Sequence, residues 1–165
     1  MNSEISQDLV IELKSQGRNT IPVIGSGNIV TIHGNNGVGK SMAATLLEIA
    51  SGNYIFENEN RFQKLANVIE SCEIHFKNKG NLLFKVILKP HLWNFDKNLN
   101  RVNPLTLGKF FKGEQKREKE IDFDEFRQNI NIRTIRGSES LQQQIIFFKD
   151  VFVAKISQKL KKLEK

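Results

Sequence analysis

Hydrophobic and polar positions divide the chain into short strand-like runs and two clearly helical stretches. Leu9 to Leu13 is apolar and partly β-branched, which predicts a short strand. A second strand is expected within Arg18 to Asn28, which ends in a glycine turn. Ile29 to Ile32 is typical of a short buried strand. From Lys40 to Ala50 the apolar positions share one side of a helix, and Gly52 is a natural stop.

The middle of the chain predicts a helix followed by a β-hairpin. Arg61 to Glu70 has a helical pattern, while Cys72 to Phe76 and Leu82 to Leu88 are strand-like. The turn between these strands, Asn78 to Asn81, suits a hairpin. His75 alternates with apolar neighbours and is expected to point to solvent.

The section that follows is irregular. Pro90 to Gly113 is rich in Asn, Pro and aromatic residues and carries no periodic signal that assigns an element. Lys112 to Glu120 has mixed charge and is expected to be a surface segment, with Lys116 to Glu120 as a charged loop that enters the next helix. Asp122 to Gln128 predicts a short helix, and Asn129 to Ile135 predicts a strand.

The last segment, Ser138 to Lys165, predicts one long helix. Its apolar positions recur at steps of three and four residues, which keeps them in a single stripe. These positions are Leu141, Ile145, Phe148, Phe152, Ile156, Leu160 and Leu163. The pattern continues to the last residue, so we expect the chain to be a truncated part of a longer protein.

Composition adds broad limits to this picture. With 165 residues and 39% hydrophobic residues, the chain can bury a real core. No apolar run approaches the roughly 20 residues that span a bilayer, and the polar start does not resemble a signal sequence. The single cysteine, Cys72, cannot form an internal disulfide, which fits a reducing cytoplasm. A net charge of +7 permits an anionic partner without identifying one.

The clearest chemical signal is the segment Gly34 to Ser41, G-N-N-G-V-G-K-S, which fits the Walker A pattern. In such a loop the backbone N–H groups surround phosphates, and the following helix points its positive end at the same anion. The residues expected to contact the nucleotide are Asn35, Asn36, Gly37, Val38, Gly39, Lys40, Ser41 and Met42. We expect Lys40 to reach the outer phosphates and Ser41 to be a ligand of Mg²⁺. The guanine-recognition motif Asn-Lys-x-Asp is missing from the sequence, which favours ATP.

With Asn36 at its asparagine position, the loop resembles the G-x-N-G-x-G-K-S form of ABC-type ATPases that act on chromosomes. The upstream order of elements is similar to the SMC family and its relatives, the coiled-coil repair ATPases. That order comprises Ile11 to Lys14, Asn19 to Ile24 and Gly27 to Ser41. Phe126 to Arg133 resembles the strand that closes the N-terminal lobe in this family, and the terminal helix resembles the root of its coiled coil.

This resemblance implies an α/β fold: an N-terminal P-loop NTPase lobe, residues 1–137, with an added antiparallel β section, and the start of a coiled coil, residues 138–165. It implies ATP and Mg²⁺ as ligands and a cytoplasmic protein without a membrane partner. It also implies three partners: the C-terminal lobe of the same ATPase, a second head in a homodimer, and double-stranded DNA. The absent lobe would supply the Walker B carboxylates and the signature motif, so hydrolysis is expected only with it. Repair, chromosome organisation and phage defence all use such ATPases.

Two features leave alternatives open. The glutamine that the family places after the closing strand is not obvious: Thr134 lies near that position, and Gln142 to Gln144 come later, on the predicted helix. Asp124 and Glu125 follow an apolar residue as in the end of a Walker B motif. If they were such a pair, the chain would be a self-contained small P-loop kinase or NTPase. A third alternative is a non-hydrolysing nucleotide-binding scaffold that oligomerises through the terminal helix.

Overall fold

The computed structural model describes residues 7–15, 18–21, 40–130 and 132, together with positions 142, 145, 146, 149, 153, 156, 157 and 160. The chain divides into two compact units, Met1–Ile132 and Arg133–Lys165. The predicted strand Ile29 to Ile32 and the last part of the predicted strand Arg18 to Asn28 lie outside the described residues. The predicted domain boundary after residue 137 stays a prediction.

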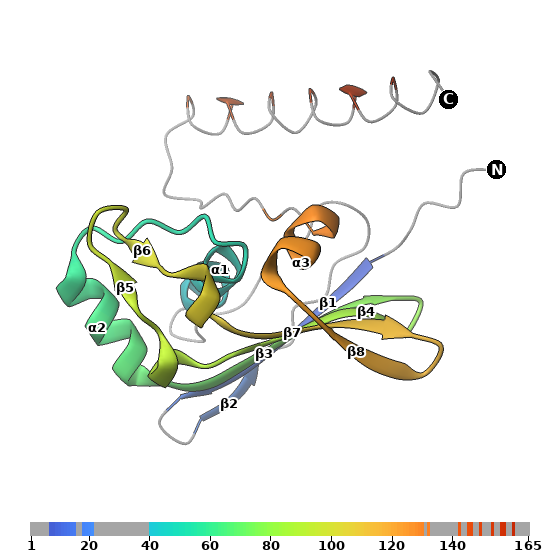
Figure 1. Cartoon of the computed structure of the whole chain (residues 1–165), viewed down its shortest axis with the longest axis horizontal. Helices are drawn as coiled ribbons and strands as arrows, with labels where there is room; N and C mark the ends of the chain where they lie inside the picture. Colours follow the sequence, from blue (N-terminus) through green and yellow to red (C-terminus); the bar gives the residue numbers. More distant parts are fainter. Residues whose placement is uncertain are drawn as a thin grey trace. The chain divides into compact units, whose positions relative to one another are not determined.

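A six-stranded sheet with the strand order β2-β1-β3-β4-β7-β8 dominates the first unit (Figure 1). Every neighbouring pair in this sheet is antiparallel. The strands are β1 Gln7–Ser15, β2 Arg18–Ile21, β3 Ile69–Asn78, β4 Asn81–Leu88, β7 Gly108–Glu114 and β8 Arg117–Ile121. The strands predicted at residues 9–13, 72–76 and 82–88 are confirmed as parts of β1, β3 and β4.

Two tight turns of the same kind connect strands of this sheet. The β3–β4 turn has Lys79 and Gly80 at φ of 48° and 80°, so the predicted hairpin is confirmed. The β7–β8 turn has Gln115 and Lys116 at φ of 40° and 71°. Two successive positive φ values match the twist of hairpin strands. Lys112 to Glu120 lies at the surface as expected, but the charged loop expected at Lys116 to Glu120 is wrong, because β8 begins at Arg117. An exposed strand tolerates charged side chains, so charge alone does not mark a loop.

Helix α1, Lys40–Ala50, has the predicted bounds. Gly52 ends it at φ of 74°. The N–H of Gly52 donates to the carbonyl of Ile49 at 2.9 Å, and the N–H of Asn53 donates to that of Glu48 at 3.2 Å. These two bonds satisfy carbonyls that a helix end otherwise leaves unpaired.

Helix α2 and helix α3 each begin at a polar capping residue. Helix α2, Glu59–Val68, begins after Asn58, whose side chain accepts the Arg61 N–H at 3.0 Å. It ends before the predicted Glu70, because Ile69 and Glu70 begin β3. Helix α3, Phe123–Asn129, begins after Asp122, whose carboxylate accepts the Glu125 N–H at 2.7 Å. The predicted short helix is confirmed.

Helix α3 also corrects two strand expectations. The strand predicted at Asn129 to Ile135 and the family-like strand at Phe126 to Arg133 both overlap it. Residues 126–129 are helical, and Ile130 and Ile132 belong to no strand. The cap at Asp122 starts the helix, and Phe126 then lies fully buried on its inner side. The other positions of these ranges lie outside the described residues.

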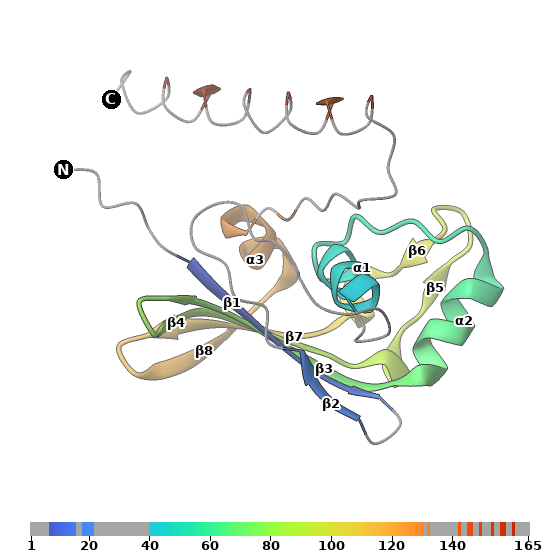
Figure 2. The same cartoon turned by 180° about the vertical axis from the view of Figure 1, so that it is seen from behind.

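The core lies between one face of the sheet and helices α1 and α3, which lie on the same side of it (Figures 1 and 2). Helix α1 contributes Ala43, Leu46 and Ala50, each with no exposed surface. The ring of Phe126 packs against three sheet phenylalanines, with centroids 5.9 Å from Phe76, 6.0 Å from Phe84 and 4.9 Å from Phe110.

Between β4 and β7 the chain makes an excursion, Lys89 to Leu107. It contains two 3-10 turns, η1 Pro90–Leu92 and η2 Pro104–Thr106, and a two-stranded sheet. The strands of this sheet are β5 Phe95–Asp96 and β6 Arg101–Val102. The N–H of Lys89 donates to the carbonyl of Leu107 at 3.0 Å and so joins the first and last residues of the excursion. The range Pro90 to Gly113, which the sequence leaves unassigned, forms most of this excursion and of β7.

In the second unit each described position is helical, as the sequence predicts. The apolar ones, Ile145, Ile146, Val153, Ile156 and Leu160, are all more than half exposed. The remaining positions of the predicted stripe, Leu141, Phe148, Phe152 and Leu163, lie outside the described residues. Among the described residues no helix combines the length and the apolar character that a membrane crossing requires.

Candidate nucleotide site

The residues of the Walker A segment divide at the start of α1. Lys40 is the first residue of the helix, and Ser41 and Met42 follow within its first turn. Ser41 is exposed, whereas Met42 is half-buried and packs against the core. The other expected contacts, Asn35, Asn36, Gly37, Val38 and Gly39, lie outside the described residues.

The first turn of α1 suits an anion. It carries no acidic side chain that would oppose a phosphate. The unpaired N–H groups and the dipole of a helix start both favour negative charge. Ala43 and Leu46, both fully buried, fix the helix against the core one turn further along. A ligand at this start would therefore meet a firmly packed helix with the Ser41 hydroxyl in solvent.

Asp124 and Glu125 do not have the placement of a Walker B pair. Such a pair follows a buried strand, but these residues lie in the first turn of α3. The strand before them, β8, is the last in the sheet order, and its first four residues are exposed. Asp124 itself is exposed. The two carboxylates thus fit the acidic first turn of a capped helix.

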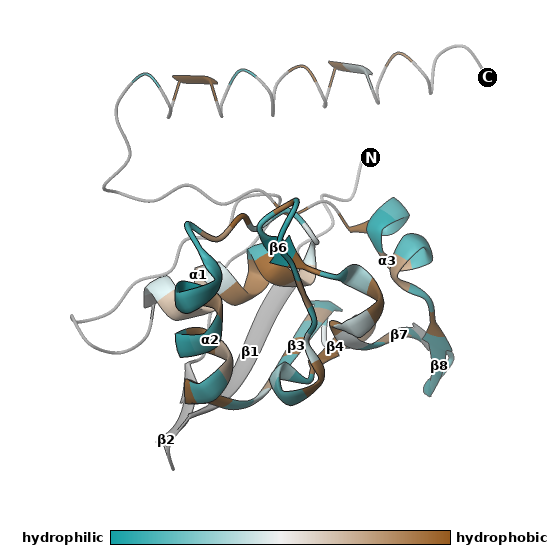
Figure 3. Cartoon of the chain, turned by 60° about the vertical axis from the view of Figure 1, so that its left-hand side comes forward, coloured by the Kyte–Doolittle hydropathy of each residue, from teal (hydrophilic) through white to brown (hydrophobic). Residues whose placement is uncertain are grey.

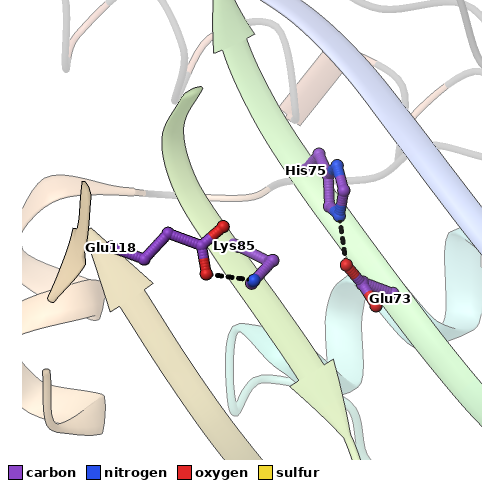
Figure 4. A network of polar contacts seen from close by, with 4 residues as sticks. All are labelled: Glu73, His75, Lys85 and Glu118. Atoms are coloured by element: carbon purple, nitrogen blue, oxygen red, sulfur yellow. Dashed lines mark hydrogen bonds and ion pairs between the residues drawn. The ribbon is translucent and has the colours of Figure 1, made fainter. Parts of the chain in front are cut away.

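The outer face of the sheet carries a polar network (Figure 4). His75 Nε2 and Glu73 Oε1 lie 2.5 Å apart on β3, and the His75 side chain is only 19% exposed. His75 lies on the outer face of the sheet, as expected, but its neighbours cover most of its side chain. Lys85 pairs with Glu118 and lies 4.8 Å from the centroid of the Phe111 ring. These contacts pair Glu73 with His75 and Glu118 with Lys85.

No metal centre accompanies this network within the part of the chain that the structure describes. No group of three or more His, Cys, Asp or Glu side chains there could hold a metal ion. Of the candidates for the glutamine that the family places after its closing strand, Gln142 is helical and exposed. Gln143, Gln144 and Thr134 lie outside the described residues.

Cys72 is a buried, unreactive thiol. It has no exposed surface and lies on the inner face of β3. Burial, with a smaller contribution from the charge of Glu73, raises the pKa of Cys72 to about 12. A thiol that stays protonated is a poor nucleophile and a poor metal ligand. The role of Cys72 is therefore packing.

Comparison with family models, curated proteins and solved structures finds no match for this chain. The functional argument therefore rests on the chemistry of its own residues.

Proposed function

We propose that the chain is the ATP-binding N-terminal part of an SMC-like ATPase head, with an α/β P-loop lobe and the start of a coiled coil. One observation carries the proposal: the Walker A segment Gly34 to Ser41 runs directly into α1, which begins at Lys40. This is the junction at which a P-loop requires a helix to start.

The described fold is compatible with this role. The hairpin of β1 and β2 precedes the Walker A segment, in the order that the resemblance implies. The antiparallel sheet corresponds to the β section expected beside a P-loop core. The helical positions between 142 and 160 agree with a long helix that follows the lobe.

Each residue has a defined task in this proposal. Lys40 neutralises the outer phosphates, and the hydroxyl of Ser41 binds the Mg²⁺ that accompanies ATP. Bound Mg²⁺ offsets the negative charge of the phosphates. The carboxylates that activate water come from the C-terminal lobe, and a second head completes the site in a cytoplasmic homodimer. Nucleotide binding then couples the heads to double-stranded DNA.

Calorimetric titration with Mg-ATP tests the proposal. The chain should bind Mg-ATP, Lys40→Ala should lose binding, and Ser41→Ala should lose the dependence on Mg²⁺. Lys64→Ala, an exposed lysine on α2, is the matched control and should bind as the parent does. Absence of binding, or equal loss in Lys40→Ala and Lys64→Ala, would contradict the proposal.

Turnover separates this proposal from a self-contained kinase or NTPase. The chain alone should hydrolyse ATP negligibly, and the downstream polypeptide of the same gene should restore hydrolysis. Robust turnover by the chain alone, lost in Asp124→Asn or Glu125→Gln, would establish the alternative. The placement of both carboxylates on α3 weighs against that outcome.

A further inference from the structure

The β3–β4 and β7–β8 hairpin turns meet at one end of the sheet. The β3–β4 turn is at Lys79 and Gly80, and the β7–β8 turn is at Gln115 and Lys116. Strands β4 and β7 are neighbours, and a Cβ added to Gly113 would lie 2.0 Å from the carbonyl oxygen of Leu82. Since Leu82 lies near the start of β4 and Gly113 near the end of β7, the two turns lie side by side.

The β7–β8 hairpin sorts its charges between its two faces. Strand β8 begins Arg-Glu-Lys-Glu, and alternate strand residues point to opposite faces. The two acidic residues are both paired on the outer face: Glu118 with Lys85, and Glu120 with Lys109 at 3.3 Å. The acidic side chains of β8 are thus already neutralised.

Among the described residues, the basic side chains on the other face form no ion pair. Lys112 stands directly opposite Lys119 in the register, although like charges in that position repel. Arg117 shares the face of Lys119, and its register partner Glu114 forms no ion pair with it within the described part of the chain. With the two turn lysines these form the tip cluster: Lys79, Lys112, Lys116, Arg117 and Lys119.

The tip cluster is a polar surface. Lys112 is half-buried and the other four side chains are exposed. None of the exposed large hydrophobic side chains of the described residues lies on either hairpin. Figure 3 accordingly shows the β7–β8 end in the hydrophilic colour. A membrane-binding surface would add apolar side chains to its cations, so a soluble polyanion fits better.

We propose that the tip cluster binds the phosphate backbone of double-stranded DNA. Arg117 and Lys119 stand two residues apart on one strand, about 7 Å. Each strand of DNA carries one charge per 3.4 Å of its axis, so about 7 Å corresponds to two such steps and the pair can contact two phosphates of one strand. Lys112 extends the cluster across the hairpin, and the turn lysines extend it along the end of the sheet. The proposal rests on the proposed function, to which it adds the surface that DNA contacts.

Fluorescence anisotropy with a labelled 30-base-pair duplex tests the proposal. The test variant is Lys116→Gln/Arg117→Gln/Lys119→Gln. The control is Arg61→Gln/Lys64→Gln/Lys97→Gln, which removes the same three charges from exposed positions on α2 and the excursion. At about 50 mM salt the test variant should lose at least about tenfold in affinity and the control less than about twofold. The slope of log affinity against log salt should fall by about 0.9 per lost phosphate contact.

Circular dichroism and thermal unfolding establish that both variants are folded. Equal losses in both variants, or an unchanged salt slope in the test variant, would overturn the proposal. So would tighter binding to vesicles of anionic lipid than to the duplex. Mg-ATP titration of the same samples distinguishes the two proposals: nucleotide binding without tip-dependent DNA binding overturns this inference alone, and the reverse overturns the nucleotide proposal alone.

Discussion

The indole Nε1 of Trp93 donates a hydrogen bond of 2.8 Å to the backbone carbonyl of Leu107, the last residue of the excursion. The same carbonyl accepts the N–H of Lys89 at 3.0 Å. Trp93 is 6% exposed and Leu107 is fully buried. The buried carbonyl of Leu107, at the end of the excursion, thus accepts hydrogen bonds both from Lys89 at its start and from Trp93.

Replacing Trp93 by Phe should lower the free energy of unfolding by about 1 kcal/mol, because the indole donor is lost while the carbonyl keeps its bond from Lys89. Trp93→Ala should cost about 3–5 kcal/mol, because it also opens a cavity. Urea unfolding followed by circular dichroism measures both. The control is Leu105→Ala, at a side chain 89% exposed, which should change stability by less than about 0.5 kcal/mol. A Trp93→Phe variant as stable as the parent would contradict the role of this bond.

Gly52 and Gly80 allow the effects of backbone strain and crowding to be separated. Both have positive φ, 74° and 80°. A Cβ at Gly52 would lie 2.6 Å from Cζ of Phe123, whereas a Cβ at Gly80 would meet nothing within 4 Å. Gly80→Ala should therefore cost about 1–2 kcal/mol of stability, and Gly52→Ala distinctly more. Adding Phe123→Leu should relieve part of the Gly52→Ala cost. If the two substitutions had strictly additive effects on the free energy of unfolding in urea, this explanation would be contradicted.

Phe126→Ala should be among the most destabilising single changes in the described core. Its ring contacts three sheet phenylalanines and anchors α3 to the sheet. The expected loss is about 3–5 kcal/mol in the free energy of unfolding. Phe111→Ala is the control, since Phe111 is half-buried on the opposite face of the sheet. Equal losses for the two variants would show that α3 depends less on this ring than its burial indicates.

The buried thiol of Cys72 should make stability depend on pH in the alkaline range. Its pKa is raised to about 12 in the folded chain, above the value of about 8.5 for an exposed thiol. The folded state therefore disfavours the thiolate, and the stabilisation is complete below about pH 8.5 and is lost as pH rises towards 12. Comparing the parent with Cys72→Ala between pH 8 and 10.5 isolates this contribution from that of the lysines. Fast reaction of the native thiol with a disulfide reagent at pH 8 would refute the burial argument.

Most elements with a local signal could be predicted from the sequence. Helix α1 has both an amphipathic pattern and a glycine that ends it, and its bounds were predicted to the residue. Strands β3 and β4 have period-two alternation around a turn of suitable composition. The end of α2 was misplaced because Ile69 suits a helix and a strand equally, and pairing with the sheet decides between them.

The excursion and the tip cluster carry weaker signals. Strands β5 and β6 have two residues each, too short for any periodicity. The alternation Arg-Glu-Lys-Glu in β8 is a strand signal, but it is masked when charged residues are read as loop residues. The Walker A pattern is visible in the sequence alone, whereas the register that places Lys112 beside Lys119 comes from pairing between strands.

The pairing of β1 with β3 has a consequence for ligand binding. Between these partners in the sequence lie β2, the Walker A segment, α1 and α2, so this pairing closes a long loop of the chain that contains the proposed site. Closing such a loop has a larger entropic cost than closing the short loops of the local hairpins. A nucleotide that binds only the folded chain would raise its stability in proportion to RT ln(1 + [L]/Kd). Separation of β1 from β3 would then be linked to release of the ligand, and bound ATP would stabilise the first hairpin of the sheet.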